Sequence, residues 1–124
     1  MKQQNYETGK TGEELAGEFL EKKGYKIIER NFRTRFGEID LIVSDKDSLV
    51  FVEVKTKVGE DFGTPEEMIN LNKIEKVQRM AEIYTVKNSG ISEQFSGLRI
   101  DAVCLVLNMS MSLSRIDHYE NIGF

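Results

Sequence analysis

The chain has 124 residues, of which 40% are hydrophobic and 31% charged, and its formal net charge is −4. Such a composition is typical of one globular domain, here residues 1–124, and no apolar run approaches the roughly 20 residues that a membrane span requires. With this acidic net charge, the chain lacks the overall basicity of a nonspecific DNA-binding protein. The single cysteine excludes an internal disulfide, so we expect a reducing, cytoplasmic setting.

A first helix is predicted from about Thr11 to Lys23. Thr11 and Glu14 have the spacing of a capping box, and Gly24 is typical of a residue that ends a helix. In a helix with this start, Glu14 lies on the solvent-facing side, whereas Glu13 lies on the same side as the small and apolar residues Ala16, Gly17 and Leu20. Glu13 therefore either points toward the sheet or only interacts with the helix dipole.

A strand from Tyr25 to Phe32 leads into the most informative part of the chain, a hairpin made of Gly37–Ile42 and Phe51–Lys55. Both segments are rich in β-branched and aromatic residues, which favour strands. The polar stretch Asp45–Ser48 between them is typical of a tight turn. The sequence therefore predicts two antiparallel neighbours whose register is set by this turn.

The two-residue period of side chains assigns each hairpin residue to a face of the sheet. One face is continuous core: Ile39, Leu41, Val43, Val50, Val52 and Val54. The other face carries, in opposing pairs, Asp40 and Glu53, Glu38 and Lys55, and Ile42 and Phe51. Because carboxylates that face each other repel, Asp40 and Glu53 beside Lys55 suggest oxygen ligands for a divalent metal and an ammonium for phosphate or water. A solvated face of mixed charge is the alternative interpretation.

The remainder of the chain predicts a helix and two further strands. The sequence Thr64-Pro65-Glu66-Glu67 is a helix-start signature, opening either the long helix that follows or a short turn before it. Helical spacing continues to about Val86, and a polar loop follows. The strands are Leu98–Leu107 and Leu113–Tyr119, joined by Asn108–Ser112. This order of elements indicates an α/β arrangement around one mixed sheet.

Other candidate residues have plainer interpretations. Cys104 lies in an apolar run and is expected to be a buried core thiol. His118, the only histidine, is expected to be a surface or inter-strand side chain rather than a general base. Asp101 either supports the acidic site or forms a salt bridge or strand-end hydrogen bond beside Arg99. Basic residues, which are either solvated or in contact with phosphate, gather in two clusters: Lys22, Lys23, Lys26, Arg30, Arg33 and Arg35, and Lys73, Lys76 and Arg79.

Short motifs along the chain carry a resemblance to a known family. They are Gly9-Lys10-Thr11-Gly12-Glu13 with Ala16, Gly24-Tyr25, Arg30-Asn31, Gly37 to Ile42, Phe51 to Lys55, Phe62-Gly63, Lys73, Ala81 with Tyr84, and Arg99-Ile100-Asp101. In order and spacing they resemble the bacterial YraN-like family, which is uncharacterised in its physiology. That family is similar to the PD-(D/E)xK nuclease superfamily, particularly archaeal Holliday-junction resolvases. Here Ile39 occupies the place of the superfamily's proline, and Lys57 stands where family members more often have arginine.

The resemblance implies an α/β, restriction-endonuclease-like fold, with a mixed sheet of about five strands, a central antiparallel hairpin and flanking helices. It also implies a metal-dependent endonuclease acting on DNA, including branched or structured DNA. The implied ligands of Mg²⁺ or Mn²⁺ are Asp40, Glu53, the backbone carbonyl of Val54 and, as the open case, Glu13, with Lys55 in a catalytic role. Residues expected at the nucleic acid are Arg33, Arg35, Lys57 and Lys73. The alternative is a noncatalytic nucleic-acid-binding or scaffold protein that retains the fold, and a homodimer is one option for its assembly.

Overall fold

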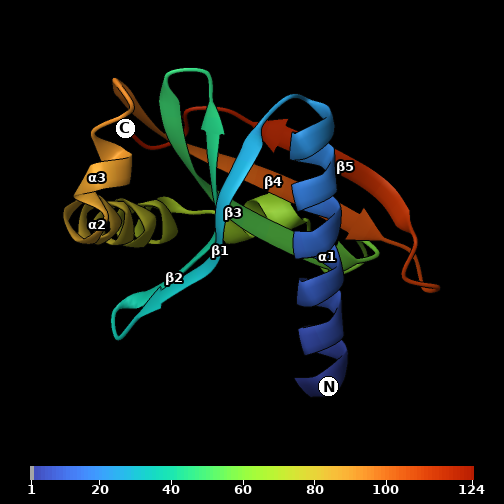
Figure 1. Ribbon diagram of the computed structural model, residues 1–124. Helices are drawn as coiled ribbons and strands as arrows, with labels where there is room; N and C mark the ends of the chain where they lie inside the picture. Colours follow the sequence, from blue (N-terminus) through green and yellow to red (C-terminus); the bar gives the residue numbers. More distant parts are fainter. Residues whose placement is uncertain (1) are drawn as a thin grey trace.

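The computed structural model describes residues 2–124, which form a five-stranded sheet with helices on both faces (Figure 1). The elements in chain order are α1 (Lys2–Lys22), β1 (Lys26–Thr34), β2 (Gly37–Asp45), β3 (Ser48–Val58), the 3-10 turn η1 (Pro65–Met68), α2 (Leu71–Lys87), α3 (Ser89–Ser92), β4 (Gly97–Leu107) and β5 (Leu113–Tyr119). The strand order is β1-β2-β3-β4-β5, with β3 and β4 parallel and the other neighbours antiparallel. The predicted restriction-endonuclease-like architecture, an α/β mixed sheet with a central antiparallel hairpin, is confirmed.

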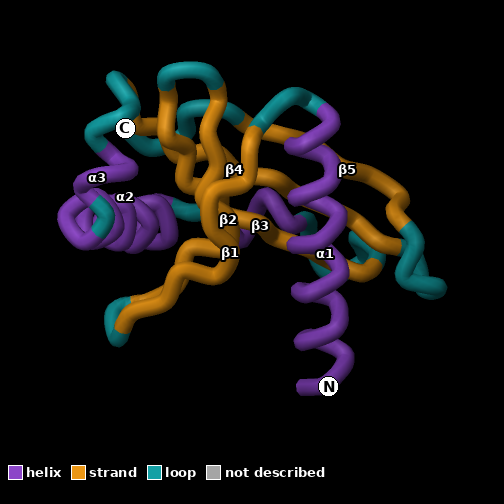
Figure 2. The backbone as a smooth tube through the Cα atoms, viewed as in Figure 1, coloured by secondary structure: helices purple, strands orange, loops and turns teal. Residues whose placement is uncertain are grey.

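The two long helices cover opposite faces of the sheet (Figures 1 and 2). Helix α1 packs Ala16 and Leu20 against one face, formed by Leu41, Val43, Val50, Val52, Val54, Val103 and Leu105. Helix α2 packs its buried side chains against the other face, which includes Ile42, Leu49, Phe51 and Ile100. Burial on both sides explains the apolar runs 49–52 of β3 and 102–107 of β4, as is typical of parallel strands.

The β2–β3 hairpin has the predicted register close to its turn. Asp45 pairs with Ser48, so that Lys46 and Asp47 alone form the turn. Lys46 adopts a φ of 55°, the positive value that tight hairpin turns require. Farther along, Ile42 pairs with Phe51. The turn chemistry and the alternation of apolar residues are therefore sufficient to set this part of the sheet.

Beyond this region β2 and β3 separate. The β2–β3 ladder ends at Leu41 and Val52, whereas β2 remains paired with β1 as far as Gly37. The predicted oppositions of Asp40 to Glu53 and of Glu38 to Lys55 both fall beyond the end of the ladder and are therefore wrong as strand pairs. Glu38 instead lies opposite Arg33 of β1, and its Oε2 is 3.2 Å from the Arg33 Nε. The separation leaves an unpaired edge of β3 next to β2, and the acidic residues gather there.

A left-handed residue in β1 breaks the alternation of side chains. Asn31 has a φ of 52°, which asparagine tolerates better than most residues. Before it in the ladder, Leu41 lies on the face that α1 covers; after it, the pair Phe32 and Ile39 lies in the cluster beneath α2. The prediction that Ile39 shares a face with Leu41 is therefore wrong, because a period of two holds only while the strand stays extended.

Helix α1 is longer than predicted. It begins at Lys2, so Thr11 and Glu14 lie inside it and the predicted capping box is wrong. Glycine lowers helix propensity in this region, but packing against the sheet compensates. A Cβ added to Gly12 would lie 1.8 Å from the Thr56 Oγ1, so the helix backbone rests directly on β3. The capping-box pattern is a local signal, whereas the helix is also supported by the tertiary contact between Gly12 and Thr56.

The long helix after Pro65 is separate from the proline. Pro65 opens η1, capped by the Thr64 Oγ1, which accepts the Glu67 N–H at 3.4 Å. Helix α2 then begins anew after Asn70, whose Oδ1 accepts the Lys73 N–H at 3.0 Å. The alternative of a short turn before the helix is thus the one that the structure adopts.

The remaining boundaries are close to those predicted. Gly24, with a φ of 97°, follows the end of α1. Strand β5 has the predicted bounds, and β4 begins one residue before Leu98. The short helix α3 occupies part of the predicted polar loop. None of the helices that the structure describes is long and apolar enough to cross a membrane.

Candidate metal centre

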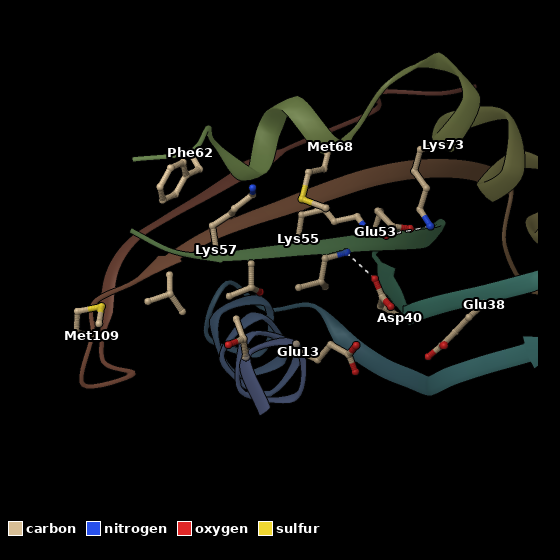
Figure 3. A pocket seen from close by; sticks show the side chains of 15 residues that line it. Glu13, Glu38, Asp40, Glu53, Lys55, Lys57, Phe62, Met68, Lys73 and Met109 are labelled. Atoms are coloured by element: carbon tan, nitrogen blue, oxygen red, sulfur yellow. Dashed lines mark hydrogen bonds and ion pairs between the residues drawn. The ribbon is translucent and has the colours of Figure 1, made fainter. Parts of the chain in front are cut away.

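A groove of about 950 Å³ lies along the edge where β2 parts from β3 (Figure 3). Its walls come from α1, β2, β3 and the segment that contains η1 and the start of α2. Four acidic side chains, Glu13, Glu38, Asp40 and Glu53, gather at one end of the groove. The structure therefore brings together acidic side chains from one helix, α1, and two strands, β2 and β3.

Asp40 occupies the gap left by the end of the ladder. Its Oδ2 accepts the Val54 N–H at 2.8 Å, so a side-chain oxygen takes the place of a backbone partner. The N–H and C=O groups of one residue in an extended strand point to the same edge. The carbonyl of Val54 therefore faces the same gap as its amide. This edge combines a carboxylate and a backbone carbonyl, both of which are oxygen donors.

Glu53 is the buried member of the cluster, with 4% of its side chain exposed. Its Oε1 lies 3.6 Å from the Nζ of Lys55, which is two residues along β3 and on the same face. The Nζ of Lys73, from the first turn of α2, lies at the same distance of 3.6 Å. Because an unpaired charge is costly to bury, these two ammonium groups offset the desolvation of Glu53.

Glu13 and Glu38 complete the acidic cluster. One carboxylate oxygen each from Glu13, Glu38 and Asp40 lies within 4.8 Å of the others. The Nδ2 of Asn31 donates to Glu13 at 2.9 Å and to Glu38 at 2.8 Å, which holds the two carboxylates together. Glu14, by contrast, is exposed. The helix phase predicted from the apolar stripe thus places the correct glutamate at the site.

The carboxyl groups have shifted proton affinities. Burial, together with the charge of Glu53, raises the pKa of Asp40 well above its usual range. Burial also raises the pKa of Glu53, although Lys73 and Lys55 oppose that change. Crowded carboxylates that cannot all ionise at low cost are stabilised by a cation placed between them. Hard oxygen donors of this kind fit Mg²⁺ or Mn²⁺ rather than a metal that prefers nitrogen or sulfur.

The basic residues predicted at the nucleic acid lie in two places. Lys57 and Lys73 line the groove. Arg33 and Arg35 lie instead near the β1–β2 turn, away from the groove lining. Arg33 is paired with Glu38, and the Arg35 guanidinium lies 4.8 Å from the centroid of the Phe36 ring. Of these four residues only the two lysines line the groove, whereas Arg33 contacts the acidic cluster through Glu38 from outside the groove lining.

Comparison with known proteins decides the family. The model of the uncharacterised protein family UPF0102 matches residues 12–105. A UPF0102 protein of Caldanaerobacter subterraneus subsp. tengcongensis is 39% identical over 123 residues, 98% of each chain. A UPF0102 protein of Syntrophomonas wolfei is 42% identical over 117 residues, covering 94% of this chain and 97% of that protein. The chain belongs to the UPF0102 family. This is the YraN family that the sequence motifs resemble.

The sequence does not predict two residues of this site. Its pattern pairs Glu38 with Lys55, but Glu38 belongs to the acidic cluster. Asn31 stands in the Arg-Asn motif without a predicted role, and it bridges Glu13 and Glu38. An asparagine within a predicted strand is uncommon, and this was the signal that something other than regular pairing occurs there. The position of Glu38 had no such local signal, because it depends on where β2 leaves β3.

A second polar network lies on the α1 side of the sheet, away from the acidic cluster. Asp101 is fully buried and forms a bidentate pair with Arg99, with both N–O distances at 2.9 Å. The Nε2 of His118, whose side chain is 2% exposed, lies 2.8 Å from the same carboxylate. Burial acts to raise the pKa of Asp101, but hydrogen bonds from His118 and Arg99 outweigh it and lower the pKa. Asp101 thus has the structural role, and His118 is an inter-strand side chain rather than a surface one.

Cys104 has the predicted role of a core thiol. It is fully buried in β4. Burial raises the pKa of its thiol to about 12. The thiolate is the reactive form of cysteine, so a thiol that stays protonated belongs to the packing of the core.

Proposed function

We propose that this protein is a metal-dependent endonuclease that acts on DNA. The observation that carries the proposal is the convergence of Asp40, Glu53 and Lys55 at an unpaired strand edge, in a groove that Lys57 and Lys73 also line. If these carboxylates were only part of a solvated, mixed-charge face, we would not expect one of them, Glu53, to be buried. Carboxylates of this kind, with an ammonium beside them, suit hydrolysis of a phosphodiester.

The donor set fits a divalent ion with a preference for oxygen. Asp40, Glu53, the Val54 carbonyl and Glu13 would hold it, and Glu38 with Asn31 would keep Glu13 in place. When bound, such an ion neutralises the phosphate and makes a bound water more acidic. The raised pKa of Asp40 supports this assignment, because a bound cation would favour the ionised carboxyl.

The lysines of the groove supply positive charge where a phosphate would lie. The Lys55 ammonium, beside Glu53, can donate a hydrogen bond to a phosphate oxygen or orient the attacking water. Lys73 holds Glu53 from the other side and offers a second phosphate contact. In the hydrolysis, the water oxygen forms a bond to phosphorus, one phosphorus–oxygen bond to the sugar breaks, and the leaving oxygen takes up a proton.

Net charge does not contradict a DNA substrate. The chain carries −4 overall, but four of its acids are collected at the site where they would face a cation. Lys55, Lys57 and Lys73 lie on the same groove. We therefore expect DNA affinity that depends on the divalent ion and falls with salt.

Cleavage of a DNA panel tests the proposal. Linear, flapped and four-way DNA would be incubated with the protein in Mg²⁺ or Mn²⁺, and products resolved on a denaturing gel. Wild type should cut at least one substrate, and Glu53→Ala and Lys55→Ala should cut none, since they remove a ligand and a cation. Glu14→Ala is the matched control, because Glu14 is exposed and one residue from Glu13. Cleavage that survives Glu53→Ala would belong to a contaminant or another site.

A noncatalytic nucleic-acid-binding protein is the second candidate, favoured by lysines that line the groove whether or not a metal is present. Binding without metal separates the roles of the two variants. Glu53→Ala removes repulsion toward phosphate and should bind DNA equally or more tightly, whereas Lys55→Ala should bind more weakly and with a shallower salt dependence. Wild-type protein that binds the panel but cuts no member with either metal would establish this candidate.

A further inference from the structure

The end of the groove opposite the acids carries an exposed aromatic ring. Phe62, in the loop between β3 and η1, is 96% exposed and lines the groove (Figure 3). Met109, which is 87% exposed, lies at the same end, and so does Lys57. An isolated exposed side chain needs no explanation, but here an aromatic and a thioether side chain share a groove with a line of lysines. A surface of this composition matches a ligand with both phosphates and flat apolar rings.

The loop that presents Phe62 is held at both ends. The Gly59 N–H donates to the Leu107 carbonyl at 2.9 Å. Arg115 of β5 binds Glu60 on one side of Phe62, with an N–O distance of 2.7 Å, and Glu66 on the other, also at 2.7 Å. A guanidinium that forms ion pairs with residues on both sides of a loop restricts the loop's movement. The ring is therefore exposed at a defined place, and none of the side chains that the structure describes covers it.

The order of side chains along the groove suits a strand of nucleic acid. Lys55 and Lys57 follow Glu53 on β3 at alternate positions, so they lie on the same face. Four residues of extended strand separate Glu53 from Lys57, which is about 13 Å. This equals about four stacked nucleotides, or fewer in a more extended strand. A strand with its phosphates at the lysines and one phosphate at the acids would thus bring a base a few nucleotides away to Phe62.

We infer that Phe62 stacks against an unpaired base, so that the preferred ligand has single-stranded nucleotides next to the phosphate at the acidic cluster. This inference rests on the proposed function, because both place a nucleic-acid strand in the groove. In a duplex each base is covered by its neighbours and offers only its edges in the grooves. The face of a base is free only where the strand is unpaired, and aromatic side chains bind such faces with little regard to sequence.

Binding of two single strands of equal length and charge tests the inference. One oligonucleotide carries bases, the other is fully abasic, and affinities are measured in EDTA so that no cleavage occurs. Wild type should prefer the base-bearing strand by about fivefold to about a hundredfold. Phe62→Ala should bind both strands equally and as weakly as wild type binds the abasic strand, whereas Phe62→Trp should retain the preference. Val86→Ala, which also alters a highly exposed apolar residue but lies outside the groove lining, is the control and should match wild type.

Each other outcome overturns the inference. If Phe62→Ala keeps the preference for bases, another residue stacks them. If it weakens binding of the base-bearing strand, the abasic strand and a duplex alike, the ring is not reading an unpaired base, and a protein partner becomes the occupant to test. The proposed function has separate outcomes. Binding that depends on Phe62 but is not followed by cleavage in Mg²⁺ would support this inference and reject the nuclease function. Cleavage that Phe62→Ala leaves unaffected would support the nuclease function and reject this inference.

Discussion

At the scale of single residues, the site depends on a conflict of charge. Asp40 and Glu53 are close enough that each affects the proton affinity of the other. The Val54 N–H favours the ionised form of Asp40, but burial and the neighbouring acid outweigh it. Folding without a metal therefore raises the pKa of Asp40 and favours its protonated form. Repulsion between neighbouring carboxyl groups, and the raised pKa that results, are typical of a site that binds a ligand.

Asp40→Asn should make the metal-free protein more stable at high pH. The pKa of Asp40 is raised by folding, so its contribution to stability is present below the unfolded value near 4 and is lost as the pH rises through the folded value. Asparagine cannot ionise but can still accept the Val54 N–H. We expect the melting temperature of Asp40→Asn in EDTA to exceed that of wild type at pH 9 by about 3 to 6 °C, and the difference to shrink toward pH 5.

Thermal unfolding followed by circular dichroism between pH 5 and pH 9 measures this difference. Asp61→Asn, at an exposed position in the loop before η1, is the control and should change the melting temperature little. If wild type and Asp40→Asn lose stability in parallel as the pH rises, Asp40 is not protonated in the folded protein and the proposed conflict of charge does not exist.

At the scale of elements, the position of Glu13 depends on how closely α1 approaches β3. Gly12 lies against Thr56, and a Cβ there would also come within 2.8 Å of the Thr56 Cβ. Helix and strand backbones approach this closely only where a side chain is missing. The residue that permits the contact directly precedes the glutamate that reaches the acidic cluster. A glycine at this position therefore determines both the packing of α1 and the place of Glu13.

Gly12→Ala should destabilise the protein by about 1 to 3 kcal/mol, as is usual when a methyl group is forced into a packed contact. Gly9→Ala is a matched control on the same helix, because nothing lies within 4 Å of a Cβ at that position. It should stabilise the helix by about 0.5 to 1 kcal/mol. Urea unfolding gives both values. Adding Thr56→Ala to Gly12→Ala removes the closest contact and should restore part of the loss. Equal stability of the two glycine variants would show that α1 does not rest on β3.

Arg115 connects β5 to the segment around η1. It binds Glu60, Glu66 and Asp117. A hydrogen bond from Arg115 is the main cause that lowers the pKa of Glu66, to about 2. Because this pKa is depressed by folding, the contribution of Glu66 to stability is present above its unfolded value near 4.3 and is lost as the pH falls toward 2.

Arg115→Ala should lower the melting temperature most above pH 5, and the difference from wild type should shrink as the pH falls to 2. The same variant should weaken binding of base-bearing single strands, since the loop that carries Phe62 loses its anchor on both sides. Differential scanning calorimetry across this pH range and the oligonucleotide titration measure the two effects. A difference in melting temperature that is constant with pH would mean that Arg115 acts through packing rather than through Glu66.

At the scale of the whole molecule, local signals account for most of the fold. The turn at Lys46 and Asp47 and the alternation around it fixed the hairpin register, and the apolar stripe of α1 placed Glu13 rather than Glu14 at the sheet. What could not be predicted depends on contacts between distant segments. The separation of β2 from β3 moves Glu38 into the cluster, Ile39 changes face next to the left-handed Asn31, and α1 begins at Lys2 rather than Thr11.

A crystal soaked in Mn²⁺ would reveal whether the strand edge beside β3 binds a divalent ion between Asp40 and Glu53. Anomalous diffraction should show one ion within about 2.1 Å of carboxylate oxygens of both residues and of the Val54 carbonyl. Glu53→Gln crystals under the same conditions should show a weaker ion or none. Crystals of wild type at saturating Mn²⁺ with no ion between Asp40 and Glu53, or with an ion bound only by Glu13 and Glu38, would show that Asp40 and Glu53 do not form the metal site.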